Sequence, residues 1–368
     1  MNQMKGIEVV WQVEPVTQVD TLLEKYQSKG NENPLKRTDT SNLQEESITE
    51  GEINKEELPS FQISRSINRM ATFSDLKIER IQTTPATDLF LELKQLKDSS
   101  KKSELLSMIV TQIAKGINRM DRRKFWKIFW SLEFKVGNGE YKKCLKMPCP
   151  CLGVIEKDAE RTFSETNIFE KGSTGYTDLV SVLHAMSVYK QEITYIQGMN
   201  FIAGSLLDTF TPEESFWIFQ FLIDDYKLRK MYTDNMPLLC LFSYQLRTLI
   251  EIHLPNVNTW LIDNSLGVDI FCPQWFLTLF SINDNRDLFY QWIDLLFITG
   301  TKALFQIALS LLEISYEEGH LENFNFDAVF PASQINQSAL KSKSKGEKIC
   351  KNALKFKVSN KLLKALEK

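Results

Sequence analysis

Apolar residues recur every three or four positions through most of the chain between about residues 104 and 330. This spacing is typical of amphipathic helices. A clear example is the run Leu179, Val182, Leu183, Met186 and Tyr189. Strict alternation of apolar and polar residues, which indicates half-buried strands, is almost absent, and Gly137-Asn138-Gly139 fits a loop. The pattern predicts an all-α domain.

Two segments show where individual helices lie. Thr211-Pro212-Glu213-Glu214 combines a threonine cap, a proline in the first turn and a glutamate three residues after the cap, which predicts the start of a helix. Residues 303–314 are apolar nearly all round, as expected for a helix at the centre of the domain.

A polar stretch separates the N-terminus from this domain. Residues 28–60 contain eight acidic and four basic residues and no aromatic residue, so they bury too little apolar surface to offset the entropy of ordering. We therefore predict a short N-terminal segment at 1–27, a mostly flexible linker at 28–103 and the helical domain at 104–368. The apolar residues around Trp11 either dock onto the domain or bind a partner.

The C-terminal segment is rich in lysine. Residues 341–368 contain ten lysines and two glutamates, and apolar residues such as Phe356 and Leu363 form one face of the expected helix. This helix either packs on the domain with its lysines in solvent, or is attracted to acidic lipid headgroups.

Composition places the chain among folded globular proteins, with 43% hydrophobic and 25% charged residues. A net charge of −3 gives no chain-wide attraction for nucleic acid, so no nucleic-acid partner is expected. The first residues lack the layout of a signal peptide, and no run reaches the roughly 18 apolar residues of a spanning helix. We expect a cytoplasmic protein whose six cysteines are free thiols.

The motifs of most enzyme classes are missing. His184, His253 and His320 are far apart, and Cys149 and Cys151 have no second pair at a suitable spacing, so no metal site is expected. The chain has no phosphate-binding loop, no Gly-x-Gly-x-x-Gly and no Gly-x-Ser-x-Gly. Neither nucleotide binding by this chain alone nor a nucleophilic serine is expected.

Two polar segments do not fit the pattern of a plain helical core. In the first, Arg161 follows Asp158 by three residues, a spacing that puts the carboxylate beside the guanidinium on a helical turn. In the second, Gln197 and Asn200 interrupt an apolar, uncharged stretch. Gln197 either satisfies a neighbouring backbone group or projects from the start of a helix behind Gly198.

Together the two segments resemble the two finger motifs of the TBC domain, the family of Rab GTPase-activating proteins. The first motif, Ile-x-x-Asp-x-x-Arg-Thr, matches residues 155–162, and the second, Tyr-x-Gln-Gly-Met-Asn, matches residues 195–200. The resemblance extends from Gly116 to Glu367, with proline replaced at Asn118 and Ser164. Other similar segments are Gly116-Ile117 with Arg122 or Arg123 and Trp126, Trp275 to Ser281, Trp292-Ile293-Asp294, Gly300 with Ala303 to Leu309, and Ala353 to Leu366.

The resemblance implies a TBC-type multi-helix fold and a role for each motif residue. Arg161 would be an arginine finger that reaches the γ-phosphate of a partner's GTP. Gln197 would be a glutamine finger that orients the attacking water in place of the GTPase's own glutamine. Asp158 would position Arg161. The other supporting residues would be Thr162, Tyr195, Gly198, Met199 and Asn200.

The same resemblance implies a GTPase-activating protein for a Rab-family GTPase and a regulator of vesicle trafficking. The partner would be the GTP-bound Rab, which would carry the Mg²⁺ and the GTP, so no cofactor is expected on this chain. Because the chain would have no hydrolase activity of its own, we predict that it is not an enzyme. A peripheral association with endomembranes is left open. The alternative is a non-catalytic TBC-fold scaffold that binds a Rab or a membrane partner.

Overall fold

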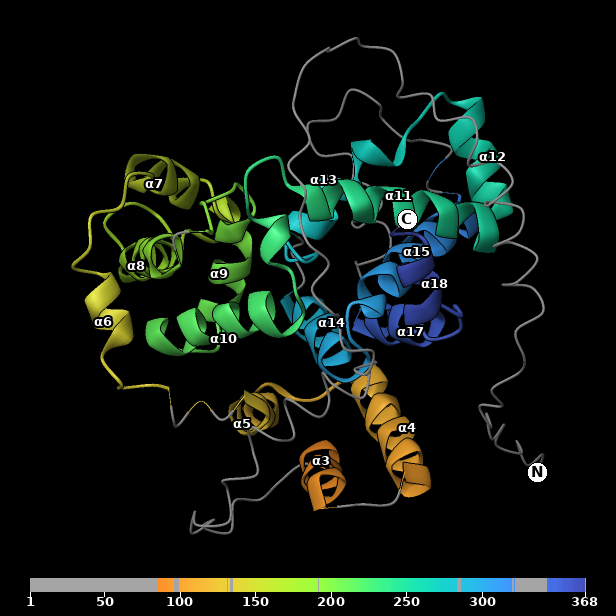
Figure 1. The fold of residues 1–368 in the computed structure, drawn as a ribbon, viewed down its shortest axis with the longest axis horizontal. Helices are drawn as coiled ribbons and strands as arrows, with labels where there is room; N and C mark the ends of the chain where they lie inside the picture. The colour runs from red at the N-terminus through yellow and green to blue at the C-terminus, as the bar shows by residue number, and fades with distance from the viewer. Residues whose placement is uncertain are drawn as a thin grey trace, which may run out of the picture. The chain divides into compact units, whose positions relative to one another are not determined.

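The structure is a computed structural model that describes residues 85–95, 99–130, 132, 135–190, 192–282, 286–319, 321 and 343–367. Every regular element in these ranges is helical, and none of the described residues lies in a strand (Figure 1). The prediction of an all-α fold is confirmed. The chain divides into two units, and the fold described below belongs to the larger one, residues 57–360.

The first group of helices surrounds α8. It consists of α6 (Glu140–Cys144), α7 (Leu152–Glu160), α8 (Thr174–Tyr189), α9 (Met199–Leu207) and α10 (Pro212–Asp225). α8 packs against the other four (Figure 1). The residues of the predicted run, from Leu179 to Met186, are fully buried in α8 because they share the face that meets these neighbours.

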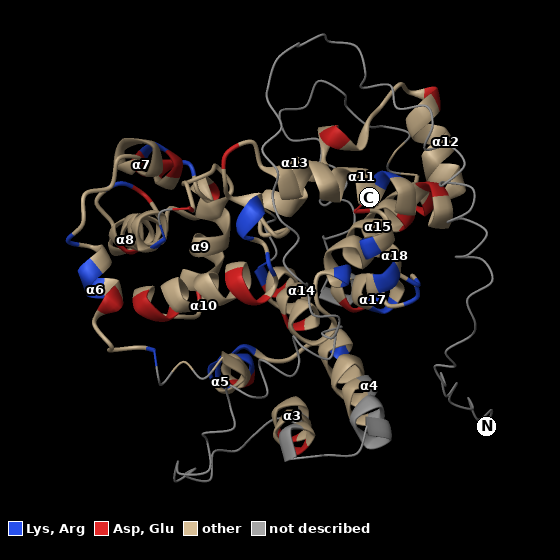
Figure 2. Ribbon diagram, viewed as in Figure 1, with Lys and Arg blue, Asp and Glu red and all other residues tan. Residues whose placement is uncertain are grey.

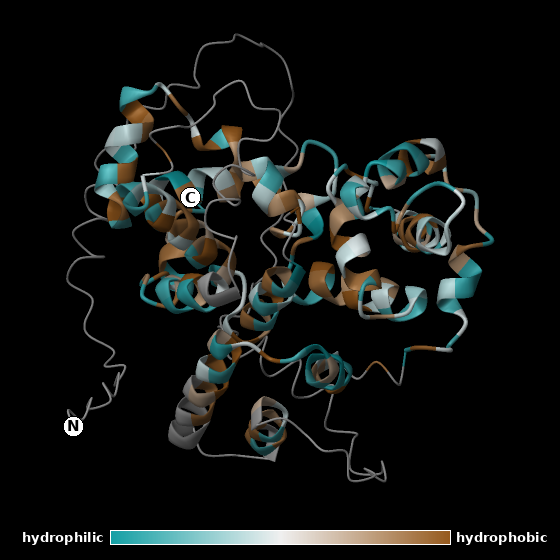
Figure 3. Cartoon of the chain, turned by 180° about the vertical axis from the view of Figure 1, so that it is seen from behind, coloured by the Kyte–Doolittle hydropathy of each residue, from teal (hydrophilic) through white to brown (hydrophobic). Residues whose placement is uncertain are grey.

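The second group surrounds α15. It consists of α11 (Pro237–His253), α12 (Pro255–Asp263), α13 (Cys272–Leu277), α14 (Arg286–Thr299), α15 (Lys302–Glu317) and α17 (Lys343–Ala353). α15 packs against α11, α12, α14 and α17, which explains why its sequence is apolar on nearly every side. Helices nearer the surface carry hydrophobic residues on one side and hydrophilic residues on the other (Figure 3).

Three N-terminal helices complete the larger unit: α3 (Pro85–Gln95), α4 (Ser99–Lys115) and α5 (Arg119–Trp130). The short elements are η3 (Ser164–Thr166), η4 (Arg229–Met231) and η5 (Val268–Ile270), and α18 (Asn360–Ala365) runs across the boundary between the two units. None of the described helices combines the length and the apolar composition that crossing a membrane requires.

Aromatic rings join α5 to α14. Phe297 of α14 lies 4.9 Å from Trp126 and 4.1 Å from Trp130, measured between ring centroids. Beside them, Nε of Arg122 lies 2.8 Å from Oδ2 of the buried Asp294, and Nε1 of Trp126 donates to Oδ1 of the same carboxylate at 2.5 Å. A buried carboxylate with two such partners fixes how α5 sits on α14.

Helical order begins earlier than the predicted boundary at residue 104. α3 and the first part of α4 lie within residues 85–103, part of the stretch for which the sequence predicts a linker. The reason is local, because Phe90 of α3 is fully buried with its ring 5.5 Å from Phe125 and 5.2 Å from Phe129. Residues 1–84, which include the predicted N-terminal segment and most of the linker, lie outside the described residues, as does His320.

Within the lysine-rich segment, α17 packs against α15 and α14 through its apolar face. Ile349, Cys350 and Ala353 of α17 are buried, while Oγ of Ser310 on α15 donates to the Ile349 carbonyl at 2.9 Å. Lysine positions colour parts of α17 blue in Figure 2, and two of these lysines, Lys348 and Lys351, pair with Glu318 and Glu347.

Candidate functional site

Arg161 lies at the C-terminal end of α7. Ile155 and Ala159 are fully buried and anchor one face of the helix, so the chain leaves α7 with Arg161 in the C-cap position. The Arg161 side chain is 55% exposed, and its NH2 lies 2.6 Å from Oδ1 of Asp158. The guanidinium is therefore held from one side and open to solvent on the other.

Asp158 connects the two motifs. Its side chain is only 5% exposed, and its second oxygen, Oδ2, accepts a hydrogen bond of 2.6 Å from the Tyr195 hydroxyl. Burial, together with this bond to Asp158, raises the pKa of Tyr195, so the phenol remains protonated and donates. A buried carboxylate is thus satisfied by one cation and one hydroxyl.

A second link runs parallel to the first. Thr162 Oγ1 donates to the Asp158 carbonyl at 2.7 Å and accepts from Nδ2 of Asn200 at 2.8 Å. Oδ1 of Asn200 in turn accepts from the Gly198 amide at 3.0 Å. Both Thr162 and Asn200 are buried, so their polar atoms join the segment after α7 to the start of α9.

Gln197 stands at the tip of the second motif. It is exposed, and its carboxamide has no hydrogen-bond partner within the described part of the chain. Gly198 follows with a φ of 117°, and a Cβ added there would lie 3.2 Å from the Leu277 carbonyl oxygen. Only glycine suits this position, because a side chain would meet both a left-handed backbone and the Leu277 backbone. Met199, fully buried, begins α9.

The turn that follows Arg161 has an unusual conformation. Phe163 has a φ of 46°, in the left-handed region that bulky residues rarely adopt. Its ring is 5.4 Å from Phe201 of α9, and the Arg286 guanidinium lies 5.0 Å above it. Gly204 leaves room for this ring, since a Cβ there would come within 3.2 Å of it. The packing holds the backbone beside Arg161 in one conformation.

The eight residues predicted from the sequence thus lie on two segments that hydrogen bonds join. Arg161 and Gln197 are exposed, and the buried contacts come from Asp158, Thr162, Tyr195 and Asn200. Chemically, the exposed pair offers a cation with planar donors and a carboxamide that both donates and accepts. Within the described ranges, no three His, Cys, Asp or Glu side chains gather in a way that suits a metal ion.

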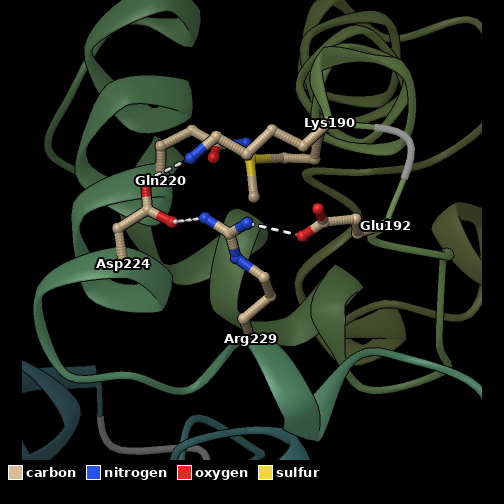
Figure 4. A network of polar contacts seen from close by, with 6 residues as sticks. Lys190, Glu192, Gln220, Asp224 and Arg229 are labelled. Carbon is tan, nitrogen blue, oxygen red and sulfur yellow. Dashed lines mark hydrogen bonds and ion pairs between the residues drawn. The ribbon is translucent and has the colours of Figure 1, made fainter. Parts of the chain in front are cut away.

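Sequence reasoning missed the residues that hold the loop before Gln197. NH1 of Arg229 lies 2.6 Å from Glu192, and NH2 lies 2.8 Å from Asp224 (Figure 4). Lys190 also pairs with Asp224, at 2.5 Å. These residues match no motif, and the two partners of one ion pair, Glu192 and Arg229, are 37 positions apart. Only the basic run around Arg229 could have drawn attention to them.

Comparison with known proteins identifies the architecture. The model of the Rab-GTPase-TBC domain family matches residues 122–320, more than half of the chain. The human protein "Ecotropic viral integration site 5 protein homolog" is 30% identical over 279 residues, which cover 75% of this chain and 34% of that protein. The Caenorhabditis elegans "Rab GTPase-activating protein eat-17" is 26% identical over 246 residues, which cover 63% of this chain and 28% of that one.

A solved structure shows the same fold. The crystal structure of the Chlamydomonas flagellar RabGAP TBC domain superposes with a TM-score of 0.57 at 23% identity, and the match covers 80% of this chain and 95% of that one. The fold and the site thus define an all-helical TBC-type domain. The chain belongs to the Rab-GTPase-TBC domain family. It spans about a third or less of the length of the curated relatives above.

These findings overturn one prediction. The sequence analysis classes the chain as not an enzyme, on the ground that it would hydrolyse nothing by itself. The match to the Rab-GTPase-TBC domain family, and the Caenorhabditis elegans relative named as a Rab GTPase-activating protein, point instead to a GTPase-activating enzyme. The error came from treating hydrolysis by the chain alone as the test of catalysis, although a residue supplied in trans can also accelerate a reaction.

Proposed function

We propose that this chain activates GTP hydrolysis by a Rab-family GTPase, with Arg161 and Gln197 as the two residues that it supplies. The observation that carries the proposal is the pairing of the two motifs. Both side chains are exposed, on segments tied together by the Tyr195–Asp158 and Asn200–Thr162 hydrogen bonds. Membership of the Rab-GTPase-TBC domain family and the name of the Caenorhabditis elegans relative support the choice of partner.

Arg161 supplies positive charge. In phosphoryl transfer the protein contributes mainly position and electrostatic stabilisation, since negative charge shifts among the phosphate oxygens in the transition state. The guanidinium fork matches those oxygens, and its pair with Asp158 fixes its direction without covering its exposed side. Asp158 is held in turn by Tyr195, so the cation is pre-positioned before the partner arrives.

Gln197 supplies an amide that can orient water. The oxygen of a carboxamide can accept a hydrogen bond from the attacking water while its NH2 group donates one to a phosphate oxygen. Its lack of a partner in the described part of the chain leaves both functions available. The left-handed Gly198 and the buried Met199 define where the loop turns into α9.

The proposed partner is the GTP-bound Rab, which would bring the nucleotide and its Mg²⁺. We place the activity in vesicle trafficking, in the cytoplasm and at the surface of endomembranes, as the family resemblance implies. Exposure of both fingers supports activation over a purely scaffolding role.

The test is a GTP-hydrolysis screen of the purified chain against a panel of GTP-loaded Rab GTPases. We expect stimulation of at least one Rab, and a fall of the order of 10³-fold for Arg161→Ala, since fingers supplied in trans are worth about 10³–10⁵ in rate. Gln197→Ala should also cause a large loss. Binding of a Rab without stimulation by the wild-type chain would instead establish the scaffold.

A second substitution, of Arg161 by lysine, distinguishes the effect of charge from the effect of the planar guanidinium. Arg161→Lys keeps the charge but loses the planar fork, so it should recover little of the lost rate. Recovery to the wild-type rate would show that a point charge suffices and would contradict a two-oxygen contact.

A further inference from the structure

The loop that carries Gln197 is bound to one neighbouring segment by ion pairs and a backbone hydrogen bond. It joins α8 to α9, and its fixed points face residues 224–232, which comprise the end of α10, the following turn and η4. Glu192 pairs with Arg229 at 2.6 Å, and the Thr194 amide donates to the Tyr232 carbonyl at 3.1 Å. The Lys190 ammonium lies 2.5 Å from Asp224 at the first residue of the loop.

Arg229 is the centre of this arrangement. Its two terminal nitrogens bind different carboxylates, NH1 that of Glu192 on the loop and NH2 that of Asp224 at the end of α10 (Figure 4). The planar guanidinium of Arg229 therefore joins the loop between α8 and α9 to the C-terminal end of α10. Glu192 is 68% exposed and Arg229 37% exposed, so this pair adds little to overall stability. Its effect is to choose one conformation of the loop.

Tyr232 supports the other end of the loop. The residue is fully buried, its ring lies 6.2 Å from Phe219, and its hydroxyl donates to the Leu277 carbonyl at 3.1 Å. The same Leu277 backbone lies against Gly198, 3.2 Å from where a Cβ would be. Tyr232 thus fixes the surface on which the residue after Gln197 rests, while its own carbonyl holds Thr194.

We propose that Arg229 and Tyr232 are positioning residues for Gln197, which they hold through Glu192 and Thr194 on one side and through Leu277 on the other. The proposal rests on the function proposed for Gln197. Within the described part of the chain, neither residue hydrogen-bonds to Arg161 or to Gln197. They act by restricting the loop, and a misplacement of about 1 Å in a group that orients a reactant can cost up to about 100-fold in rate.

The test is a double-mutant cycle on the Rab that the screen identifies, with kcat and KM measured from GTP hydrolysis. We expect Arg229→Ala to lower kcat about tenfold with little change in KM, because the proposed role of Arg229 is to position Gln197 and not to bind the Rab. In a Gln197→Ala background, Arg229→Ala should have almost no further effect, since the residue it positions is gone. A loss of equal size in both backgrounds, or a change confined to KM, would overturn the proposal.

Matched variants separate positioning from folding. Glu192→Gln removes one exposed charge, which folding tolerates, and it should reproduce part of the Arg229→Ala effect. Arg229→Lys should rescue only partly, because one ammonium lacks the fork that reaches both carboxylates. Arg247→Ala is the control: Arg247 pairs with Asp269 at 3.4 Å on an exposed surface remote from the loop in sequence, and its loss should change kcat less than about twofold.

Amide hydrogen exchange tests the anchoring of the loop in the chain alone, without a Rab. In Arg229→Ala and Tyr232→Phe, the amides of residues 192–198 should exchange faster than in the wild type, whereas Arg247→Ala should leave them unchanged. If the wild-type chain stimulates no Rab, the proposed function fails, and faster exchange would still support the anchoring of the loop. If stimulation is present and neither kcat nor exchange responds to Arg229→Ala, only the positioning role is wrong.

Discussion

At the scale of single residues, the site depends on how one buried carboxylate is shared. Asp158 gives Oδ1 to Arg161 and Oδ2 to Tyr195, so each partner determines how the other can bind. In the role proposed for Arg161, a guanidinium that was merely exposed would sample many directions, and ordering it on the partner would cost conformational entropy. Sharing the carboxylate removes that cost in advance.

Tyr195→Phe tests this sharing. It deletes the hydroxyl that donates to Oδ2 of Asp158 and leaves a buried acceptor without a partner, so we expect a loss of about 1–3 kcal/mol in the free energy of unfolding. Stimulation of the Rab should fall as well, because Arg161 loses its fixed counter-ion. Urea denaturation and the hydrolysis assay measure the two effects. Tyr244→Phe, at a 47% exposed tyrosine on α11, should change neither, and equal losses in both variants would contradict the role of Asp158.

At the scale of the helices, caps and cross-links define how the elements are mounted. Thr211 and Glu214 form a reciprocal capping box at the start of α10, as the sequence predicts. Glu214 does more than the sequence shows, since its Oε1 lies 2.6 Å from Lys127 and its Oε2 lies 2.7 Å from Arg123, both on α5. One carboxylate therefore caps α10 and binds α5 to it.

The pH dependence of stability should report on Glu214. Burial opposes ionisation, but the bonds to Lys127 and the Thr211 amide and the charge of Arg123 outweigh it, and the pKa falls below the usual 4.5. A lowered carboxyl pKa stabilises the folded state above the unfolded value, and this stability is lost as the pH falls below about 4.5. Glu214→Gln should thus cost about 1–2 kcal/mol at pH 7 and progressively less toward pH 3.

Urea midpoints between pH 7 and pH 3 measure this difference, with Asp263→Asn at the exposed end of α12 as the control. A cost for Glu214→Gln that stays constant across the range would mean that the lost contribution is packing rather than charge.

At the scale of the whole molecule, the pair Arg122–Asp294 joins α5 to α14 from within the core. Burial raises the pKa of Asp294, while Arg122 and Trp126 oppose that rise. Arg122→Met removes the main opposing charge and should cost about 3–5 kcal/mol, because a buried carboxylate loses its partner. The carboxylate then takes up a proton more readily, so the variant should be less stable at pH 8 than at pH 5.

The double variant Arg122→Met with Asp294→Leu supplies the check by chemical denaturation. It should regain most of the lost stability, since no unpaired charge remains in the core. If the double variant is no more stable than Arg122→Met alone, the cost arises from shape and not from the stranded charge.

The parts of this architecture that the sequence predicts are those written in local patterns. The run from Leu179 to Met186 and the Thr211 cap each lie within one turn or a few turns of helix, so their physical meaning does not depend on the rest of the chain. The finger motifs are recognisable for the same reason. The hydrogen bond that joins the two motifs could not be predicted in this way, because Asp158 and Tyr195 are 37 residues apart and only the folded structure shows their contact.

Other contacts could not be predicted from the sequence, either because the interacting residues are far apart along the chain or because neighbouring residues indicate a different structure. In the sequence Arg229 is one residue of an ordinary charged run. Only the folded structure shows that it pairs with both Glu192 and Asp224. Phe90 lies next to a polar stretch whose composition predicts a linker. In the structure Phe90 belongs to α3, and its ring packs against Phe125 and Phe129 of α5. Burial of Phe90, together with Ala86 and Leu93, extends the helical domain beyond the limit that composition predicts.

The backbone of Gly198 has a consequence for inherited variation. Every single-base change that replaces a glycine by another residue introduces a side chain with a Cβ. At a φ of 117° beside the Leu277 backbone, each such missense change would strain the turn next to Gln197. Every missense change at this codon is therefore expected to disturb the same turn, whichever residue replaces the glycine.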